Sequence, residues 1–524
     1  MGNNCCRGDD LYYDNPSQSR DIFKVNDLQP VFTSYPVTSL VPGGPQNPQI
    51  YNINAYVPRN YPLEKDDEVL PQLQLNNPDR PPYVIDVSLQ FAWMSFKPKN
   101  DHHDIPCALV LNAPEQPFNL RAGVDIICVI DVSGSMEEDE KLILVKRTLN
   151  FMINNLSEID RLCIISFNDR AQKLMPLTVM NNYGKTMAAT VVSYLRAGGG
   201  TNIVEGLQTA LTVAQNRNML NYTLDIMMLS DGVDNHQESS LYRARDCFMR
   251  FDQLNMSYSV HAFGYGHSHD SELLGDIAHI KNGGFYYVEE AEDIKHAFSH
   301  CLGEILSVVA RDIRISLVVQ PCPIPFTLSQ VHSECGTMNF RMPNISSGTS
   351  KEAIFILSLP PCRVAIQDIL INPFPASISF IMVNTGEIVN QERDLSIEIR
   401  NNSRNIELYK GVMIHFYRVK TAECLRIAGE LGAQHRFDEA RDVLSNGIHI
   451  LKKSEYHNDA FVKHLIRDLE NSKHKLRGHH TCHRGGHTHF RHIHHGHWAK
   501  RGEKHDFYNN ERQRNLKNQA QNFF

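Results

Sequence analysis

The sequence predicts an α/β protein whose main domain is built on a Rossmann-like, doubly wound and mostly parallel sheet. Two observations favour this class. Residues 124–308 alternate short apolar runs rich in β-branched residues, such as VDIICVID, with stretches such as KLILVKRTLNFMINNL, whose apolar residues recur at helical spacing. This alternation is typical of βαβ units, in which helices cover both faces of parallel strands.

Other segments flank this domain. Residues 1–80 are rich in Asn, Pro, Gln and Tyr without periodicity, so we expect a disordered arm. Residues 82–120 contain two strand-like stretches that we expect to join a β-sandwich-like module at residues 310–403, where the periodicity falls to two. Residues 404–476 predict three helices in a small bundle, and residues 477–524 predict a His-rich disordered tail.

Composition excludes several classes of protein. The formal charge of −7 over 524 residues argues against a generally basic nucleic-acid binder, so no nucleic-acid partner is predicted. The sequence has no apolar run of about 18 residues that would predict a transmembrane helix. The start, MGNNCCRGDD, lacks the apolar stretch of a secretory signal, so we expect a cytoplasmic protein. The 12 cysteines have no zinc-finger spacing, which favours reduced, buried thiols.

The first residues contain candidates for lipid attachment. Gly2 is the acceptor position for myristoylation once Met1 is removed, although Cys6 stands where the motif has Ser or Thr. Cys5 and Cys6 are candidates for palmitoylation, and two lipids anchor a protein more stably than one. Two alternatives stay open here. Dual lipidation would place the chain on the cytosolic face of a membrane, whereas the other alternative is an unmodified, disordered start.

Oxygen-bearing side chains follow three predicted strands or loops at the edge where open parallel sheets bind ligands. Hydroxyl and carboxylate oxygens are hard donors that suit Mg²⁺ or Mn²⁺. Because only two carboxylates would surround the ion, it would stay under-neutralised and could accept an acidic residue from a protein partner. The five candidate ligands are Asp131, Ser133 and Ser135 after VDIICVI, Thr201 after three glycines, and Asp231 after LDIMMLS.

Each of these residues could also be an ordinary turn or N-cap residue, but that reading does not explain their joint layout. DVSGS, GGGTN and LSDG together resemble the DxSxS…T…D pattern of von Willebrand factor A-type (VWFA) domains. The resemblance implies a metal-ion-dependent adhesion site (MIDAS). In it Ser133, Ser135 and Thr201 would coordinate the metal, and Asp131 and Asp231 would often act through water. Asp234 is interpreted as a turn acid, with indirect support of the metal site as the alternative.

Longer stretches, including GGGTNIVEGL and SVHAFGYGHSHDSELLGDIA, are similar to intracellular A-domain proteins of plants and protists, over roughly residues 82–450. In plant members a RING finger often precedes the A domain, and these proteins act as ubiquitin ligases. A RING needs about eight spaced Cys/His ligands, whereas residues 1–80 contain only Cys5 and Cys6. We therefore expect a binding or scaffold protein rather than an enzyme, and a component of a ubiquitin-ligase pathway remains the alternative.

Histidines crowd in the C-terminal tail, and imidazole suits Zn²⁺, Cu²⁺ or Ni²⁺. Their irregular spacing argues against a single tetrahedral site and favours loose, multivalent binding, so a transition-metal-binding protein is a further alternative. A pH-dependent polycation and a merely solvated tail also stay open. The candidate tail ligands are His479, His480, His483, His487, His489, His492, His494, His495 and His497.

Overall fold

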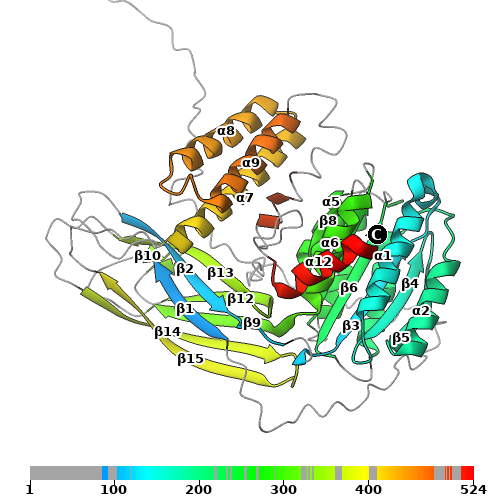
Figure 1. The fold of residues 1–524 in the computed structure, drawn as a ribbon. Coiled ribbons are helices and arrows are strands. Elements are labelled where there is room, and N and C mark those ends of the chain that lie inside the picture. Colours follow the sequence, from blue (N-terminus) through cyan, green and yellow to red (C-terminus); the bar gives the residue numbers. More distant parts are fainter. Residues whose placement is uncertain are drawn as a thin grey trace, which may run out of the picture.

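The computed structural model describes residues 85–91, 103–117, 120–217, 221–231, 234–235, 239–252, 257–266, 271–288, 291–319, 327–328, 331–332, 336–359, 369–399, 410–476, 490, 493–494, 496–497 and 509–523 (Figure 1). Among these residues, no helix is both long and apolar enough to span a membrane.

A six-stranded sheet forms the centre of the α/β domain. All neighbouring strands are parallel except β4 and β5, which pair antiparallel. The four middle strands are buried along their whole length, which explains why their sequences are continuous apolar runs. The predicted doubly wound, mostly parallel sheet is therefore confirmed. In spatial order the strands are β5 (Ala171–Val179), β4 (Arg161–Phe167), β3 (Val124–Asp131), β6 (Thr223–Ser230), β7 (Ser259–Tyr265) and β8 (Phe285–Val288).

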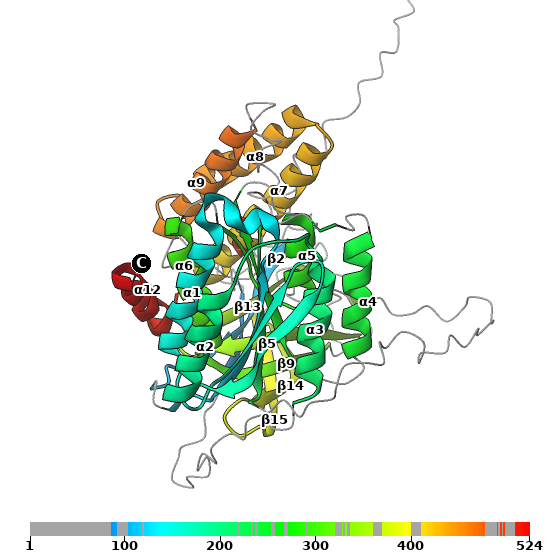
Figure 2. The same ribbon diagram turned by 90° about the vertical axis from the view of Figure 1, so that its right-hand side faces the viewer.

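Helices cover both faces of this sheet, as Figure 2 shows. Alternate residues of β3 point to opposite faces, so Ile126 and Cys128 lie in one apolar core and Ile127 and Val129 in the other. The first core is closed by α1 (Lys141–Asn155), α2 (Asn182–Tyr194) and α6 (Ala291–Ile305). The second is closed by α3 (Ile203–Gln215), α4 (Ser240–Asp252) and α5 (Ser271–Ile280).

Two antiparallel sheets form a β module beside the α/β domain (Figure 1). Strands that precede the α/β domain in the chain pair with strands that follow it, because β2 lies along β13 from the pair Asn112–Ser350 to the pair His103–Leu359. Both sheets share one apolar core. One sheet contains β1 (Asp86–Phe91), β2 (His103–Asn112), β13 (Ser350–Leu359), β10 (Thr327–Leu328) and β11 (Val331–His332); the other contains β12 (Gly336–Ser346), β9 (Val308–Val319), β14 (Ile369–Met382) and β15 (Ile388–Ile399).

A buried arginine connects the β module to the α/β domain. Arg311 on β9 donates hydrogen bonds to the carbonyl oxygen of Leu224, at 3.0 Å, and to Ser259 Oγ, at 2.8 Å. These acceptors lie at the beginning of β6 and β7. The β module therefore attaches at the amino ends of the strands and leaves their carboxyl ends to other contacts.

Three helices form a bundle above the β module (Figure 1). They are α7 (Lys410–Ala433), α8 (Phe437–Lys453) and α9 (Ala460–Lys475), and they share an apolar core of their own. The first part of α7 also packs on the β module, since Val412, Phe416 and Val419 contact apolar residues of β2 and β13. Helix α7 thus belongs to two cores.

The expectation of a disordered tail over 477–524 is wrong for its last part, where α12 (Glu511–Phe523) packs on α6. Leu516 and Ala520, one turn apart on α12, are fully buried in the core of the α/β domain. The Phe523 ring packs edge-on against Phe151, with centroids 5.4 Å apart. The helix is polar overall, and its stability comes from tertiary packing of this narrow face.

Several predicted features lie outside the described residues, namely the arm at 1–80 with its lipidation candidates Gly2, Cys5 and Cys6, and the tail residues His479, His480, His483, His487, His489, His492 and His495. Two predicted tail ligands, His494 and His497, are described. All six cysteines among the described residues are buried.

Candidate metal centre

Three loops meet at the carboxyl ends of β3 and β6 and are held together by backbone hydrogen bonds. The Gly134 N–H donates to the Gly199 oxygen at 3.0 Å, and the Gly198 N–H donates to the Val132 oxygen at 2.8 Å. The Asn235 N–H donates to the Thr201 oxygen at 2.9 Å, which attaches the loop after β6. All the segments that carry the predicted site residues therefore come together at one edge of the sheet.

The side-chain oxygens of these loops lie close to one another. Ser133 Oγ and Ser135 Oγ are 3.2 Å apart, and Ser135 Oγ lies 2.9 Å from Asp231 Oδ1. Neighbouring ligands in an octahedron with Mg²⁺–oxygen distances of about 2.1 Å are separated by about 3 Å. The spacing of the three oxygens thus fits adjacent ligands of Mg²⁺. Thr201 is buried on its own loop.

Asp131 is buried at the end of β3 and accepts hydrogen bonds on both carboxylate oxygens. The backbone N–H of Ser133 donates to Oδ1 at 2.8 Å, and Ser230 Oγ donates to Oδ2 at 2.5 Å. Burial raises the pKa of this carboxyl to about 6, although the hydrogen bonds from Ser133 and Ser230 lower it. A nearby cation would favour the ionised form. The carboxylate is thus oriented and incompletely neutralised.

A lysine that the sequence analysis did not single out lies at the same place. Lys141 Nζ is 2.6 Å from Asp231 Oδ2 and 3.3 Å from the Ser135 carbonyl oxygen, and its side chain is buried. A positive charge is unfavourable at a helix N-terminus, yet Lys141 begins α1. The ion pair with Asp231 accounts for this placement. In the sequence, a lysine in the first turn of the helix that follows DVSGS could have indicated this ion pair.

Asp234 is hydrogen-bonded to the beginning of two helices, which agrees with the alternative of indirect support for the site. Its Oδ2 accepts a hydrogen bond from the Ile203 N–H at 2.7 Å, and its Oδ1 accepts one from Ser240 Oγ at 2.6 Å. Ile203 begins α3, close to Thr201 in the chain. The side chain therefore fixes the segment that presents Thr201.

The loop after β4 also supports the glycines before Thr201, and the sequence analysis missed it. Asn168 Nδ2 donates to the Gly198 oxygen at 2.8 Å, and Asp169 Oδ2 accepts from the Gly200 N–H at 2.9 Å. Gly199 has a φ of +87°, in the region that favours glycine. The triple glycine is thus a tight turn held by side chains of a neighbouring loop.

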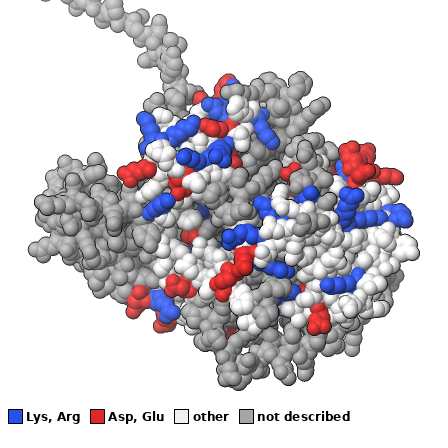
Figure 3. Space-filling model, in the orientation of Figure 1, with Lys and Arg blue, Asp and Glu red and all other residues white. Residues whose placement is uncertain are grey.

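Exposed acids lie beside the centre. The helix η5 (Gly134–Glu140) begins directly after Ser133, and its last four residues are exposed acids, Glu137, Glu138, Asp139 and Glu140. Figure 3 shows them as a red group at the upper right of the molecule. Such a surface attracts cations at long range. The approach to this edge of the sheet is therefore electrostatically favourable for a dication.

Comparison with known proteins identifies the domain that carries these loops. The family model of the von Willebrand factor type A domain matches residues 125–300. This part of the chain is a von Willebrand factor type A domain. Such domains mediate protein–protein interactions and typically bind Mg²⁺ or Mn²⁺ at a MIDAS. The five predicted ligands Asp131, Ser133, Ser135, Thr201 and Asp231 all lie within the A domain, at the carboxyl edge of its sheet.

A solved structure supports the fold. The von Willebrand factor type A protein from Catenulispora acidiphila superposes with a TM-score of 0.52, over 75% of this chain and 90% of that one, at 15% identity. Two thirds or more of both chains therefore share an architecture, although the low identity limits the likeness to the fold.

Two curated relatives extend the comparison. The chain is 28% identical over 345 residues to the E3 ubiquitin-protein ligase WAV3 of Arabidopsis thaliana, covering 62% of this chain and 43% of the relative. It is 27% identical over 215 residues to the uncharacterized protein sll0103 of Synechocystis, covering 41% and 49%. The expected likeness to plant A-domain proteins is confirmed. The chain spans less than half the length of these relatives.

Proposed function

We propose that the A domain binds a protein partner through Mg²⁺ or Mn²⁺ held by Asp131, Ser133, Ser135, Thr201 and Asp231, and that the chain acts as a scaffold or adaptor. The observation that carries this proposal is the spacing of Ser133 Oγ, Ser135 Oγ and Asp231 Oδ1, at 3.2 and 2.9 Å, from loops far apart in the sequence. When bound, the dication offers a Lewis-acidic position to a carboxylate of the partner.

The residues around the proposed metal centre have different roles. The hydroxyl oxygens of Ser133, Ser135 and Thr201 are uncharged ligands, so they would bind a cation without neutralising its charge. Asp231 Oδ1 faces Ser135 and is the oxygen available to a cation, whereas Oδ2 is held by Lys141. Lys141 therefore removes part of the negative charge of Asp231 from the centre. We therefore expect the site to have a lower affinity for the metal ion, and the bound ion to attract an incoming carboxylate more strongly.

The exposed acids of η5 restrict the kind of partner. A bare acidic surface would be repelled by residues 137–140, which are all acidic and exposed. A carboxylate that is surrounded by Lys or Arg would gain from both the metal and these acids. We therefore expect the partner segment to carry one Asp or Glu flanked by basic residues.

The test compares Asp131→Ala with the matched control Glu158→Ala, which removes an exposed carboxylate from the loop between α1 and β4. Mg²⁺ binding is measured by titration calorimetry, and partner binding by affinity purification in Mg²⁺ or in EDTA. Partner binding should disappear in EDTA and in Asp131→Ala, and should persist in Glu158→Ala. Interactions that all survive EDTA would overturn the proposal.

A second candidate function rests on the relatives. WAV3 and WAVH1 of Arabidopsis thaliana carry the name E3 ubiquitin-protein ligase, so the chain could act as a component of a ubiquitin-ligase pathway. A ubiquitin-transfer assay with the purified chain and a charged conjugating enzyme separates the two. Ubiquitin transfer would favour the second candidate, and its failure in the presence of Mg²⁺-dependent partner binding would favour the adaptor.

A further inference from the structure

Three side chains of types that bind metal ions meet at the helical bundle, outside the A domain. His464 and Asp468 lie one turn apart on α9, so they project from the same face of the helix. His497 comes from the C-terminal tail. Asp468 Oδ2 is 2.8 Å from His497 Nε2 and 3.3 Å from His464 Nε2. The three ligand atoms all lie within 4.8 Å of one another.

The tail residues at this place are packed against the bundle. Phe490 is 2% exposed in the apolar core of the bundle, close to Gly429 of α7. Arg418 of α7 donates a hydrogen bond to the carbonyl oxygen of His497. His464 and His497 are 7% and 3% exposed, and the Asp468 side chain is 15% exposed. Contacts outside the cluster therefore position His497.

We propose that His464, Asp468 and His497 form a Zn²⁺ site. Two imidazoles and a carboxylate are ligands that Zn²⁺ prefers, whereas Mg²⁺ prefers oxygen alone. In a tetrahedron with zinc–ligand distances of about 2.0–2.1 Å, the ligands are about 3.3 Å apart. Asp468 Oδ2 and His464 Nε2 already have this separation, 3.3 Å. Water completes the fourth position.

This site differs from the loose binding that the histidine spacing predicted. It uses one tail histidine, and its other ligands belong to a helix that the sequence analysis assigned to the bundle. The ion would join α9 to residue 497 of the tail.

The test uses the full chain with Zn²⁺ and with Co²⁺ as a spectroscopic substitute. The unaltered chain should bind one Co²⁺ with the strong visible absorption of a tetrahedral site. His464→Gln and His497→Gln should lose this signal, and their Zn²⁺ affinity should fall at least about 100-fold, since loss of an outer-shell partner alone costs about 10–100-fold. The matched control is His474→Gln, an exposed histidine on the same helix.

A second variant separates this site from general binding by the tail. In this variant, Asn replaces seven other tail histidines, and the tight site should stay intact. The seven are His479, His480, His483, His487, His489, His492 and His495. The proposal is overturned if this variant loses the tight Co²⁺ signal, or if His464→Gln keeps the affinity of the unaltered chain.

X-ray absorption of the unaltered, zinc-loaded chain gives a readout that does not depend on how the variants fold. Two imidazoles and one carboxylate per zinc support the proposal, and four imidazoles contradict it. Asp131→Ala should bind Zn²⁺ as the unaltered chain does, because the two centres share no residue.

Discussion

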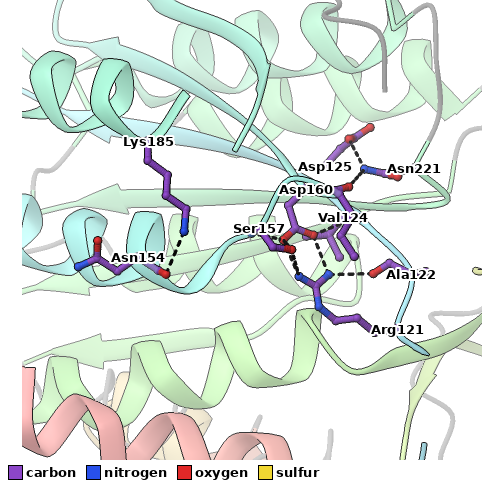
Figure 4. A network of polar contacts seen from close by, with 10 residues as sticks. Arg121, Ala122, Val124, Asp125, Asn154, Ser157, Asp160, Lys185 and Asn221 are labelled. Atoms are coloured by element: carbon purple, nitrogen blue, oxygen red, sulfur yellow. Dashed lines mark hydrogen bonds and ion pairs between the residues drawn. The ribbon is translucent and has the colours of Figure 1, made fainter. Parts of the chain in front are cut away.

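Both edges of the mostly parallel sheet bury aspartates, but the partners of these aspartates differ. At the amino edge, Asp125 is paired with Arg161 at 2.7 Å and with Arg217 at 2.6 Å, and Asp160 is paired with Arg121 at 2.6 Å. Figure 4 shows Arg121 directed at Asp160, and Asn221 at Asp125. At the carboxyl edge, Asp131 accepts hydrogen bonds from the Ser230 hydroxyl and the Ser133 backbone N–H. Asp231 accepts from the Ser135 hydroxyl and from Lys141 Nζ.

The difference separates a structural use of buried acids from a functional one. Guanidinium groups pair with both carboxylates at the amino edge and leave neither of them unpaired to attract a cation. Hydroxyls at the carboxyl edge orient carboxylates without neutralising them. Buried aspartates therefore stabilise the domain at the amino ends of the strands and form part of a candidate cation site at their carboxyl ends.

The largest effect on stability is expected at the amino edge. Arg161→Met removes a fully buried guanidinium that donates two hydrogen bonds to Asp125, and it leaves the carboxylate with Arg217 and Asn221 only. Loss of one partner of a buried pair costs about 3–5 kcal/mol of the free energy of unfolding. Urea denaturation in EDTA measures this loss.

The control for that change is Arg426→Ala, which breaks solvent-exposed pairs with Glu423 and Glu430 on α7 and should cost about 1 kcal/mol or less. Equal costs for the two changes would mean that the amino edge has no special structural role.

Asp131→Ala should have the reverse pattern, a large effect on metal binding and a small one on stability. It removes a carboxylate whose burial is already unfavourable, as the raised pKa of about 6 shows. We expect Mg²⁺ affinity to fall at least about 100-fold, because removal of outer-shell partners alone costs about 10–100-fold. Titration calorimetry with Mg²⁺ and denaturation in EDTA measure the two effects. If Asp131→Ala lost as much stability as Arg161→Met, the buried aspartates of the two edges would not differ in structural role.

Asp234→Ala should weaken Mg²⁺ binding by about 10–100-fold although Asp234 is not a proposed ligand. The Ile203 N–H would lose its acceptor, and the segment that carries Thr201 would lose a fixed position. Asp234→Asn retains one oxygen acceptor and should have a smaller effect. Calorimetry with both variants checks the order, and identical losses would show that charge rather than hydrogen bonding matters here.

Lys141→Gln should tighten Mg²⁺ binding, by at least about tenfold, because it removes a positive charge next to Asp231. The same change should weaken partner binding at saturating Mg²⁺, since Asp231 would then neutralise more of the ion. The control is Arg147→Gln, an exposed cation on the same helix. Unchanged Mg²⁺ affinity in Lys141→Gln would show that the lysine is only a structural partner of Asp231.

The sheet and the candidate ligands could be predicted because each depends on a local pattern. VDIICVID is followed directly by its serines, and Asp231 follows its own strand, so strand periodicity alone places them at one edge. Asn168 and Ser230 could not be found in this way. Their roles arise from contacts between loops, such as the 2.5 Å hydrogen bond from Ser230 to Asp131, that no local pattern encodes.

The C-terminal region was misjudged for a related reason. The segment 511–523 is polar on average, and its helix depends on two buried residues, Leu516 and Ala520, that fit the core of another domain. His497 was one histidine among many in the sequence. Its proximity to His464 and Asp468 follows from the packing of Phe490 and the bond from Arg418, which composition does not reveal.

Anomalous scattering from crystals grown with Mn²⁺ tests the central claim most directly. The account predicts a manganese peak at the carboxyl edge of the sheet, in contact with Ser133 Oγ, Ser135 Oγ and Thr201 Oγ1, that Asp131→Ala abolishes. Saturating Mn²⁺ without a peak at this position, in crystals where the three loops are ordered, would contradict it.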